Sequence, residues 1–188
     1  MNTILIVILV LFVIVFVITI LFILINNSIL KSDQLVQEAN SGIDTQLRRR
    51  YDLIPSLIET VKGYAGYEKT LLENISKLRA GTVEEQSIVK KAYDSDELSN
   101  SVKSIFAIAE NYPDLKANQN FLDLQKNLTE IEEAIQYARR YYNGTVREYN
   151  IKIVSFPMSI VAKAINTPKK EFFTATGIEK ENVEVKMS

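Results

Sequence analysis

The sequence predicts an all-α protein: an antiparallel four-helix up-and-down bundle preceded by one amino-terminal transmembrane helix. The first thirty residues contain one long apolar run, and the rest of the chain repeats apolar residues at helical spacings of three and four. Only 4 prolines and 6 glycines interrupt the 188 residues, and such long uninterrupted segments favour helix over sheet.

The run from Ile4 to Ile25 consists of Ile, Leu, Val and Phe and is broken only by Thr19. As a helix, its 22 residues span about 33 Å, which matches a hydrocarbon core of about 30 Å. The many β-branched side chains do not oppose this, because in lipid the backbone must satisfy its own hydrogen bonds. We therefore assign residues 1–27 to a transmembrane signal-anchor.

Two other interpretations of this run are weaker. A cleaved signal peptide has a basic start and a small-residue exit, whereas this chain starts Met-Asn-Thr and leaves the run through Asn26 and Asn27. A lipoprotein signal needs a cysteine, and the chain has none. A buried core helix is rarely apolar on all sides over this length.

The charges beside the run bear on its orientation. Lys31 and, further on, Arg48 to Arg50 follow it, while the amino side offers only the terminal amine. Because positive residues favour the cytoplasmic side, we expect a single-pass membrane protein whose soluble domain is cytoplasmic.

The longest predicted helix follows Pro113, begins near Asp114 and ends before Pro157. Apolar and aromatic residues recur in it every seven positions, which is typical of helices that pack at a shallow angle. This seam consists of Phe121, Leu128, Ile135, Tyr142, Tyr149 and Phe156. A second seam consists of Leu124, Ile131 and Ala138 and then slips by one to Val146 and Ile153.

Two further helices are indicated. Spacings of three and four predict one from Ile54 to Leu78, with Gly81 as a stop. Another is expected over 95–111, with a capping box at Asp94 and Glu97. Its inward residues are Leu98, Val102, Ile105 and Ala109, and the polar stretch 82–93 is expected to be a connection.

The segment 28–50 shares its register with Ile54 and Leu57, although Asn40 and Arg50 interrupt the apolar face. One long helix kinked at Pro55 and two helices joined by a turn there both fit. We favour the turn, because four antiparallel helices bury the long carboxyl-terminal seam better than three. The predicted bundle covers residues 28–165, and residues 166–188 are expected to form a loosely ordered tail.

Composition excludes several classes of function. The 22 basic and 23 acidic side chains nearly cancel, so no nucleic-acid partner is indicated. The chain has no cysteine, histidine or tryptophan, which removes thiol chemistry, the usual proton-transfer residue and the commonest transition-metal ligand. We expect no catalytic residue, no cofactor and no metal. Acidic pairs such as Glu132 and Glu133 are better explained as solvated helix faces.

Three blocks of sequence are similar to those of the LemA family. They are IDTQLRRRYDLIP over 43–55, YPDLKA over 112–117, and RRYYN over 139–143 followed by Tyr149-Asn150 and Phe156-Pro157. Asn40 and Ser56 stand where many members carry tryptophan and asparagine. The resemblance implies a bacterial protein with one amino-terminal span and an antiparallel four-helix soluble domain. It supplies no biochemical activity and no catalytic residues.

The densest charge cluster offers a candidate partner-binding patch made of Arg48, Arg49, Arg50 and Asp52. Anionic lipid is a poor partner for it, because a continuing helix places it roughly 34 Å beyond Ile25, several Debye lengths of about 8 Å. The alternative to an acidic partner is pairing inside the chain, for example between Asp44 and Arg48 four residues later.

Asn143, Tyr149 and Asn150 form a second candidate set. The two asparagines are seven residues apart and each follows a tyrosine. They either line a polar groove or, as buried asparagines do in coiled coils, fix the register of packed helices.

Three functions remain. The first is a non-enzymatic membrane-tethered scaffold or adaptor that binds another envelope protein, with a homo-oligomer as a special case. The second is a sensor of a small ligand or lipid, with a pocket lined by Tyr112, Tyr141 and Tyr149. The third is a membrane-bound hydrolase, which only the presence of carboxylate, Ser, Tyr and Lys side chains supports.

Overall fold

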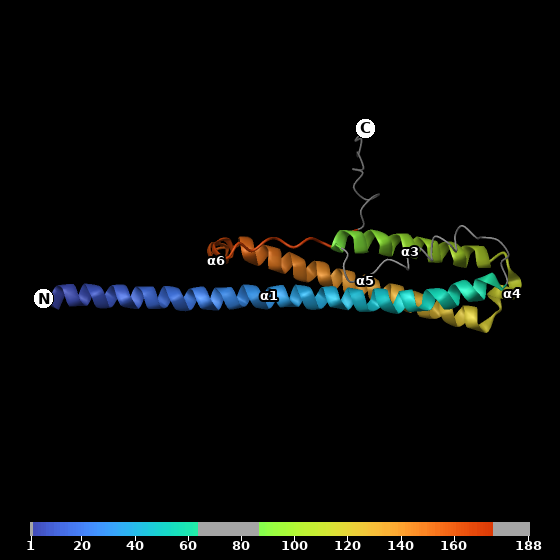
Figure 1. Cartoon of the computed structure of the whole chain (residues 1–188), viewed down its shortest axis with the longest axis horizontal. Coiled ribbons are helices and arrows are strands. Elements are labelled where there is room, and N and C mark those ends of the chain that lie inside the picture. The colour runs from blue at the N-terminus through green and yellow to red at the C-terminus, as the bar shows by residue number, and fades with distance from the viewer. Residues whose placement is uncertain (1, 64–86, 175–188) are drawn as a thin grey trace, which may run out of the picture. The chain divides into compact units, whose positions relative to one another are not determined.

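A computed structural model describes residues 2–63 and 87–174, and within these ranges it contains helices and connections but no strand (Figure 1). The helices are α1 (Asn2–Lys62), α3 (Ile88–Ala109), α4 (Pro113–Lys116), α5 (Gln119–Val154) and α6 (Met158–Ala164). The chain divides into unit 1, Met1–Glu38 with Gly144–Lys170, and unit 2, Ala39–Asn143 with Glu171–Ser188. The predicted all-α bundle with an apolar amino-terminal helix is confirmed.

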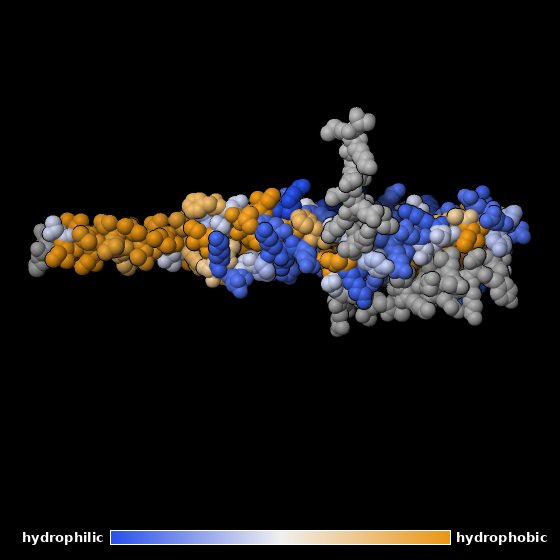
Figure 2. All heavy atoms as spheres, turned by 90° about the horizontal axis from the view of Figure 1, so that it is seen from above, coloured by the Kyte–Doolittle hydropathy of each residue, from blue (hydrophilic) through white to orange (hydrophobic). Residues whose placement is uncertain are grey.

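The apolar side chains in the amino-terminal part of α1 are exposed along the whole run from Ile4 to Leu24, and Figure 2 shows one face of this apolar surface. Among the described helices, α1 alone is long and apolar enough to cross a membrane, and its most apolar stretch is not buried against the protein. The alternative of a buried core helix is therefore wrong. An apolar surface of this extent is stable only in an apolar surrounding.

The turn that we favoured at Pro55 is wrong, because α1 continues through this residue to Lys62. Proline removes one backbone hydrogen bond and disfavours a helix interior by about 3 kcal/mol. The inward face nevertheless continues without a break: Ile54, Leu57 and Val61 are all buried. Burial of this face offsets the defect at Pro55. The rest of the helix predicted over 54–78 lies outside the described residues.

The helix predicted from Asp114 is interrupted after Lys116, where α4 ends and the chain turns before α5. The side chain of Asn118 explains the break. Its Oδ1 accepts a hydrogen bond from the backbone N–H of Phe121 at 3.1 Å, as an N-cap residue does. This bond satisfies a free donor at the start of α5.

The observed α3 begins at Ile88, seven residues before the predicted start at Ser95. Ser87 caps it by accepting a hydrogen bond from the backbone N–H of Lys90 at 3.3 Å, in place of the expected capping box at Asp94. The extra turns bury Lys91 and Ala92. All four residues predicted to face inward on this helix are buried.

Unit 2 has an apolar core at the end where α3, α4 and the start of α5 meet. The predicted seam residues Phe121 and Leu128 are buried there, and the ring of Phe121 meets the edge of Phe106 at a centroid distance of 5.9 Å. The remaining buried members are Ile54, Leu57, Val61, Leu98, Val102, Ile105, Ala109 and Leu115.

Unit 1 packs the carboxyl-terminal part of α5 and α6 with α1. Its buried apolar residues are Ile29, Val36, Val146, Tyr149, Ile153, Val161 and Ala162. Lys152 of α5 reaches α1, where its Nζ donates to Ser32 Oγ and, at 3.4 Å, to the backbone carbonyl of Ser28. The predicted seam fails only at its last member: α5 ends at Val154, and Phe156 is 81% exposed.

Candidate functional site

A layer of polar side chains crosses the core of unit 2 and centres on Arg50. The inward positions of α1 follow spacings of four and three through Ile43, Leu47, Arg50 and Ile54, so Arg50 occupies a core position. It is only 2% exposed. The layer therefore replaces one apolar level of the bundle with a charged one.

The guanidinium of Arg50 binds groups from two other helices. Its Nη1 donates to Ser99 Oγ of α3 at 2.8 Å and to Glu132 Oε2 of α5 at 3.1 Å. Its Nη2 donates to the hydroxyl and the carbonyl of Ser95, at 2.9 and 3.2 Å. Ser99 Oγ also donates to Glu132 Oε2, at 2.9 Å. Four of the five guanidinium donors lie on these two nitrogens.

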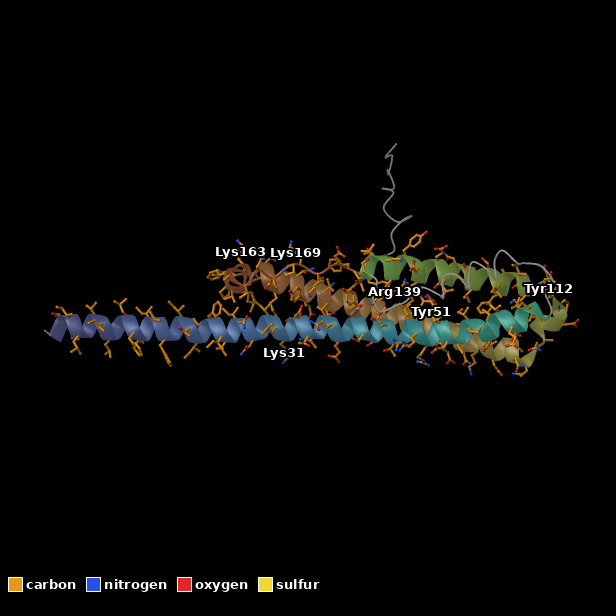
Figure 3. All side chains as sticks on the ribbon, viewed as in Figure 1. Lys31, Tyr51, Tyr112, Arg139, Lys163 and Lys169 are labelled. Carbon is orange, nitrogen blue, oxygen red and sulfur yellow. The ribbon has the colours of Figure 1, made fainter. Side chains whose placement is uncertain are left out.

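Arg139 of α5 closes the same layer from the other side. It donates to Ser95 Oγ at 2.8 Å and forms an ion pair with Asp96 at 2.6 Å. Figure 3 labels Arg139 and, next to Arg50 in the sequence, Tyr51. A second buried cation, Lys91, pairs with both carboxylate oxygens of Asp44 at 2.7 and 2.9 Å.

The protonation states of this layer follow from burial and pairing. Burial lowers the pKa of Arg50 from its ordinary value, but the guanidinium stays charged at neutral pH. Burial acts to raise the pKa of Glu132, yet hydrogen bonds from Gln136 and Ser99 and the charges of both arginines outweigh it, so its net pKa lies below 4.5. The Arg50–Glu132 pair is therefore ionised at neutral pH.

This layer has the features of a structural element. A group active in acid–base catalysis has a pKa moved toward neutrality, whereas these shifts keep both partners charged. Within the described ranges, no cluster of three or more Asp or Glu side chains is arranged to hold a metal ion. Buried ionic layers of this kind are best known for fixing which helices pair and in which register.

The candidate patch is divided by the structure. Arg48 and Arg49 are exposed on α1, as is Asp52, whereas Arg50 points into the core. Arg49 and Asp52 line a groove of about 530 Å³ whose other wall is formed by α5. The groove is lined by Arg49, Asp52, Leu53, Asn127, Glu130 and Ile131. Its lining thus combines charges of both signs with two apolar side chains.

The two asparagines of the second candidate set bind the segment after α6. In unit 2, Asn143 donates to the carbonyl of Phe173 at 3.0 Å and accepts from its N–H at 2.8 Å. In unit 1, Asn150 makes the same pair of bonds with Lys170, both at 2.9 Å. Each side chain thereby satisfies one backbone donor and one acceptor.

The tyrosine that precedes each asparagine on α5 also binds the segment after α6. Tyr142 donates to the carbonyl of Glu171 at 3.0 Å, and Tyr149 donates to that of Pro168 at 3.3 Å. Burial raises the pKa of both hydroxyls. These contacts were not anticipated, since we assigned residues 166–188 to a loosely ordered tail. Residues 175–188 lie outside the described part of the chain.

Two cations complete the attachment of this segment. In unit 1, Lys170 pairs with Asp33 at 2.7 Å and lies 5.7 Å from the ring centroid of Tyr149. In unit 2, the guanidinium of Arg139 lies 4.8 Å from the ring centroid of Phe173. Phe173 is buried as a result.

The pocket expected between Tyr112, Tyr141 and Tyr149 stays a prediction. Tyr112 packs against the apolar core of unit 2, Tyr141 is exposed, and Tyr149 is buried in unit 1. Neither the groove beside Arg49 in unit 2 nor a second groove in unit 1 is lined by these tyrosines.

The fold and the polar layer define a class: an all-α bundle with one apolar amino-terminal helix and a charged layer in its core. The family model described as LemA family matches residues 39–187, most of the chain. The chain belongs to the LemA family.

The chain is similar to a protein named LemA and to magnetosome proteins named MamQ. Protein LemA of Metamycoplasma hominis is 27% identical over 162 residues, 84% of this chain and 73% of that protein. Magnetosome protein MamQ 2 of Paramagnetospirillum magneticum is 23% identical over 173 residues, 78% of this chain and 64% of that protein. Magnetosome protein MamQ of Magnetospirillum gryphiswaldense is 20% identical, with 73% and 60% covered. The chain thus spans less than two thirds of both MamQ proteins. None of these names is that of an enzyme.

Proposed function

We propose that this chain is a non-enzymatic adaptor, anchored by α1 in the bacterial cell membrane, that binds another envelope protein through the groove of unit 2. The anchor is supported by the exposed apolar stretch of α1. The adaptor role is supported by the pairing of the buried charges among the described residues. Arg50 pairs with Glu132 and Arg139 pairs with Asp96, so these groups are not available for catalysis.

The groove beside Arg49 is the observation that carries the binding role. Leu53 and Ile131 give it an apolar floor, while Arg49, Asp52 and Glu130 supply charges at its rims. This chemistry suits an amphipathic helix whose apolar face meets the floor and whose charged flanks pair with the rims. The proposed partner is therefore a helical segment with charges of both signs.

A photo-crosslinking amino acid at Glu130 tests the proposal in the full chain, in the membranes of the cells that make it. Thr129 is the matched control, because its exposed side chain points about 100° away from Glu130 around the same helix and does not line the groove. We expect one heterologous protein crosslinked at Glu130 and not at Thr129, and lost on Arg49→Glu. Equal products at both positions, or only crosslinks between copies of this chain, would contradict the proposal.

The volume of the groove also favours a second candidate, a small-ligand sensor. Its roughly 530 Å³ lies in the range of ligand pockets, although one side is open. The sensor role predicts that a metabolite or lipid raises the thermal midpoint of the full chain in detergent, and that Asn127→Ala removes the increase. A library that leaves the midpoint unchanged would eliminate this candidate.

A further inference from the structure

Unit 1 ends in a cluster of exposed apolar side chains. After α5, the chain turns at Phe156 and Pro157 into the short helix α6. Phe156 is 81% exposed and Ile160 of α6 is 61% exposed, whereas Val161 and Ala162 on the other face of α6 are buried. Ile151 and Val154, in the last turn of α5, are each 55% exposed. Such a local concentration of apolar surface indicates a binding surface.

The contacts within unit 1 fix the level of this cluster along α1. Lys152 reaches Ser28 and Ser32, and Lys170 joins Asp33 of α1 to Tyr149 of α5. In unit 1, α5 and α1 are therefore antiparallel, and higher residue numbers on α5 lie level with lower residue numbers on α1. α5 ends at Val154, two residues beyond Lys152 and about 3 Å further along the helix, and the chain turns there. The cluster therefore lies near the level of Ile25, where the apolar run of α1 ends.

The orientation of α6 suits the surface of a membrane. Figure 1 shows α6 end-on while α1 runs across the view, so α6 lies across α1 and not along it. If α1 crosses the bilayer, α6 lies in the plane of the headgroups. Helices that bind membrane surfaces take this orientation and place their apolar side about 5–10 Å into the headgroup and acyl boundary.

A second groove, of about 470 Å³, is lined by the end of α5, by α6 and by the segment after it, and carries two lysines. Figure 3 shows Lys163 and Lys169 on the same side of this region, pointing away from α1. Within the described residues, neither ammonium group has a carboxylate partner. The groove is lined by Ile153, Val154, Ser159, Ala162, Lys163, Asn166, Thr167 and Lys169. Two cations among hydroxyl and amide groups match the phosphate of a lipid headgroup.

We propose that the end of unit 1 is a second membrane contact: Phe156 and Ile160 enter the lipid beside α1, and Lys163 and Lys169 bind anionic phospholipid headgroups. This inference rests on the proposed membrane crossing by α1. The second contact fixes the tilt of α1 and α5 against the bilayer, because one transmembrane helix alone does not fix it.

The full chain contains no tryptophan, so a single introduced tryptophan reports its own surroundings. Phe156→Trp is compared with Phe16→Trp, in the middle of the apolar run, and with Leu35→Trp, an exposed apolar position ten residues beyond it. Each variant is reconstituted in phosphatidylcholine vesicles containing phosphatidylglycerol, with or without bromine on the acyl chains. Circular dichroism confirms that each remains helical.

We expect bromolipid to quench the emission at positions 16 and 156 and to leave position 35 unchanged. Quenching at 16 but not at 156 would overturn this inference and leave the anchor intact, whereas absence of quenching at 16 would overturn the anchor itself. Emission at 156 that is shifted to the blue without bromine quenching would also overturn it, since a second copy of the chain or another protein then covers the cluster.

The lysines are tested in the same vesicles. We expect the quenching of Phe156→Trp to increase when phosphatidylglycerol is added to phosphatidylcholine, and the increase to be lost when Lys163→Glu and Lys169→Glu are introduced together. Arg147→Glu, an exposed basic position on α5, is the matched charge control and should keep the increase. An increase that survives the double lysine change, or one that inorganic phosphate abolishes at equal concentration, would contradict the headgroup assignment.

Discussion

At the scale of single residues, Arg50 carries the most consequence. It stands in a core position of α1 and binds Ser95, Ser99 and Glu132 from two other helices. A charge in such a place contributes specificity more than stability, because its desolvation offsets much of the attraction to its partner. Its Nε is buried and has no acceptor among the described residues, which adds to that cost.

Removing the guanidinium is nevertheless expected to destabilise the fold. Arg50→Ala removes one hydrogen-bond donor from each of Ser95, Ser99 and Glu132 and the charge that pairs with Glu132, and breaking a buried pair in this way costs about 3 kcal/mol. Denaturant unfolding of the full chain in detergent, followed by circular dichroism, measures the loss. Arg49→Ala is the matched control, because its neighbouring side chain is exposed and should change stability by less than about 0.5 kcal/mol. Equal effects of the two changes would show that Arg50 has no special role.

Glu132 is expected to make stability dependent on acid. Its pKa in the folded chain lies below 4.5, so its contribution is complete above that pH and is lost as the pH falls through the folded value. The free energy of unfolding should therefore differ between the natural chain and Glu132→Gln at pH 7, and the difference should shrink below about pH 4.5. A difference that stays constant from pH 7 to pH 3 would be inconsistent with an ionised, paired Glu132.

At the scale of elements, the sequence predicted which faces are buried better than where helices begin and end. The seven-residue seam of α5 is buried from Phe121 to Tyr149, and the inward face of α3 is as expected. The errors are at Pro55, at Asn118 and at the start of α3. A proline or a capping side chain acts locally, whereas whether a helix continues there depends on the burial of a face that distant helices complete.

Pro55 can be tested directly, because α1 continues on both sides of it. Pro55→Ala restores a backbone donor within a helix and is expected to stabilise the full chain, by at most about 3 kcal/mol. Ser56→Ala, at the next exposed position, serves as the control in the same unfolding experiment. Loss of stability in Pro55→Ala would support a turn at this residue.

The segment after α6 depends on the asparagines of α5. Asn150→Ala removes both hydrogen bonds to Lys170, and each such bond contributes about 0.5–1.5 kcal/mol. Amide hydrogen exchange at Lys170 should then accelerate, while amides in the middle of α3 keep their rates. Asn120→Ala, an exposed asparagine on the same helix, should leave the exchange at Lys170 unchanged. Unaltered exchange in Asn150→Ala would show that other contacts hold the segment.

The sites were harder to predict than the elements. The sequence indicated that Arg50 interrupts an apolar face, but its partners lie 45 to 82 residues away, and local spacing pointed instead to neighbouring carboxylates. The seven-residue spacing of Asn143 and Asn150 was visible, yet their partner is an extended backbone segment that has no periodic signal. The seven residues from Asn143 to Asn150 span about 10 Å in a helix, and the three residues from Lys170 to Phe173 span about 10 Å as extended chain. One extended segment can therefore bind both asparagines.

At the scale of the whole molecule, the proposed function joins a membrane crossing by α1 to a helical domain that binds another protein. The family model places the chain in the LemA family without assigning it a reaction. The two grooves have different proposed ligands: the groove in unit 2 suits a helix of another protein, and the groove in unit 1 suits lipid headgroups.

The crossing is the claim on which the rest depends, and single cysteines test it because the chain has none. Phe16→Cys and Gln34→Cys are exposed to a membrane-impermeant maleimide, first in intact cells and then after lysis without detergent. We predict that Gln34→Cys is labelled only after lysis, as a cytoplasmic position is, and that Phe16→Cys is labelled under neither condition. Rapid labelling of Phe16→Cys after lysis would show that the apolar run lies in water, and the account would be wrong.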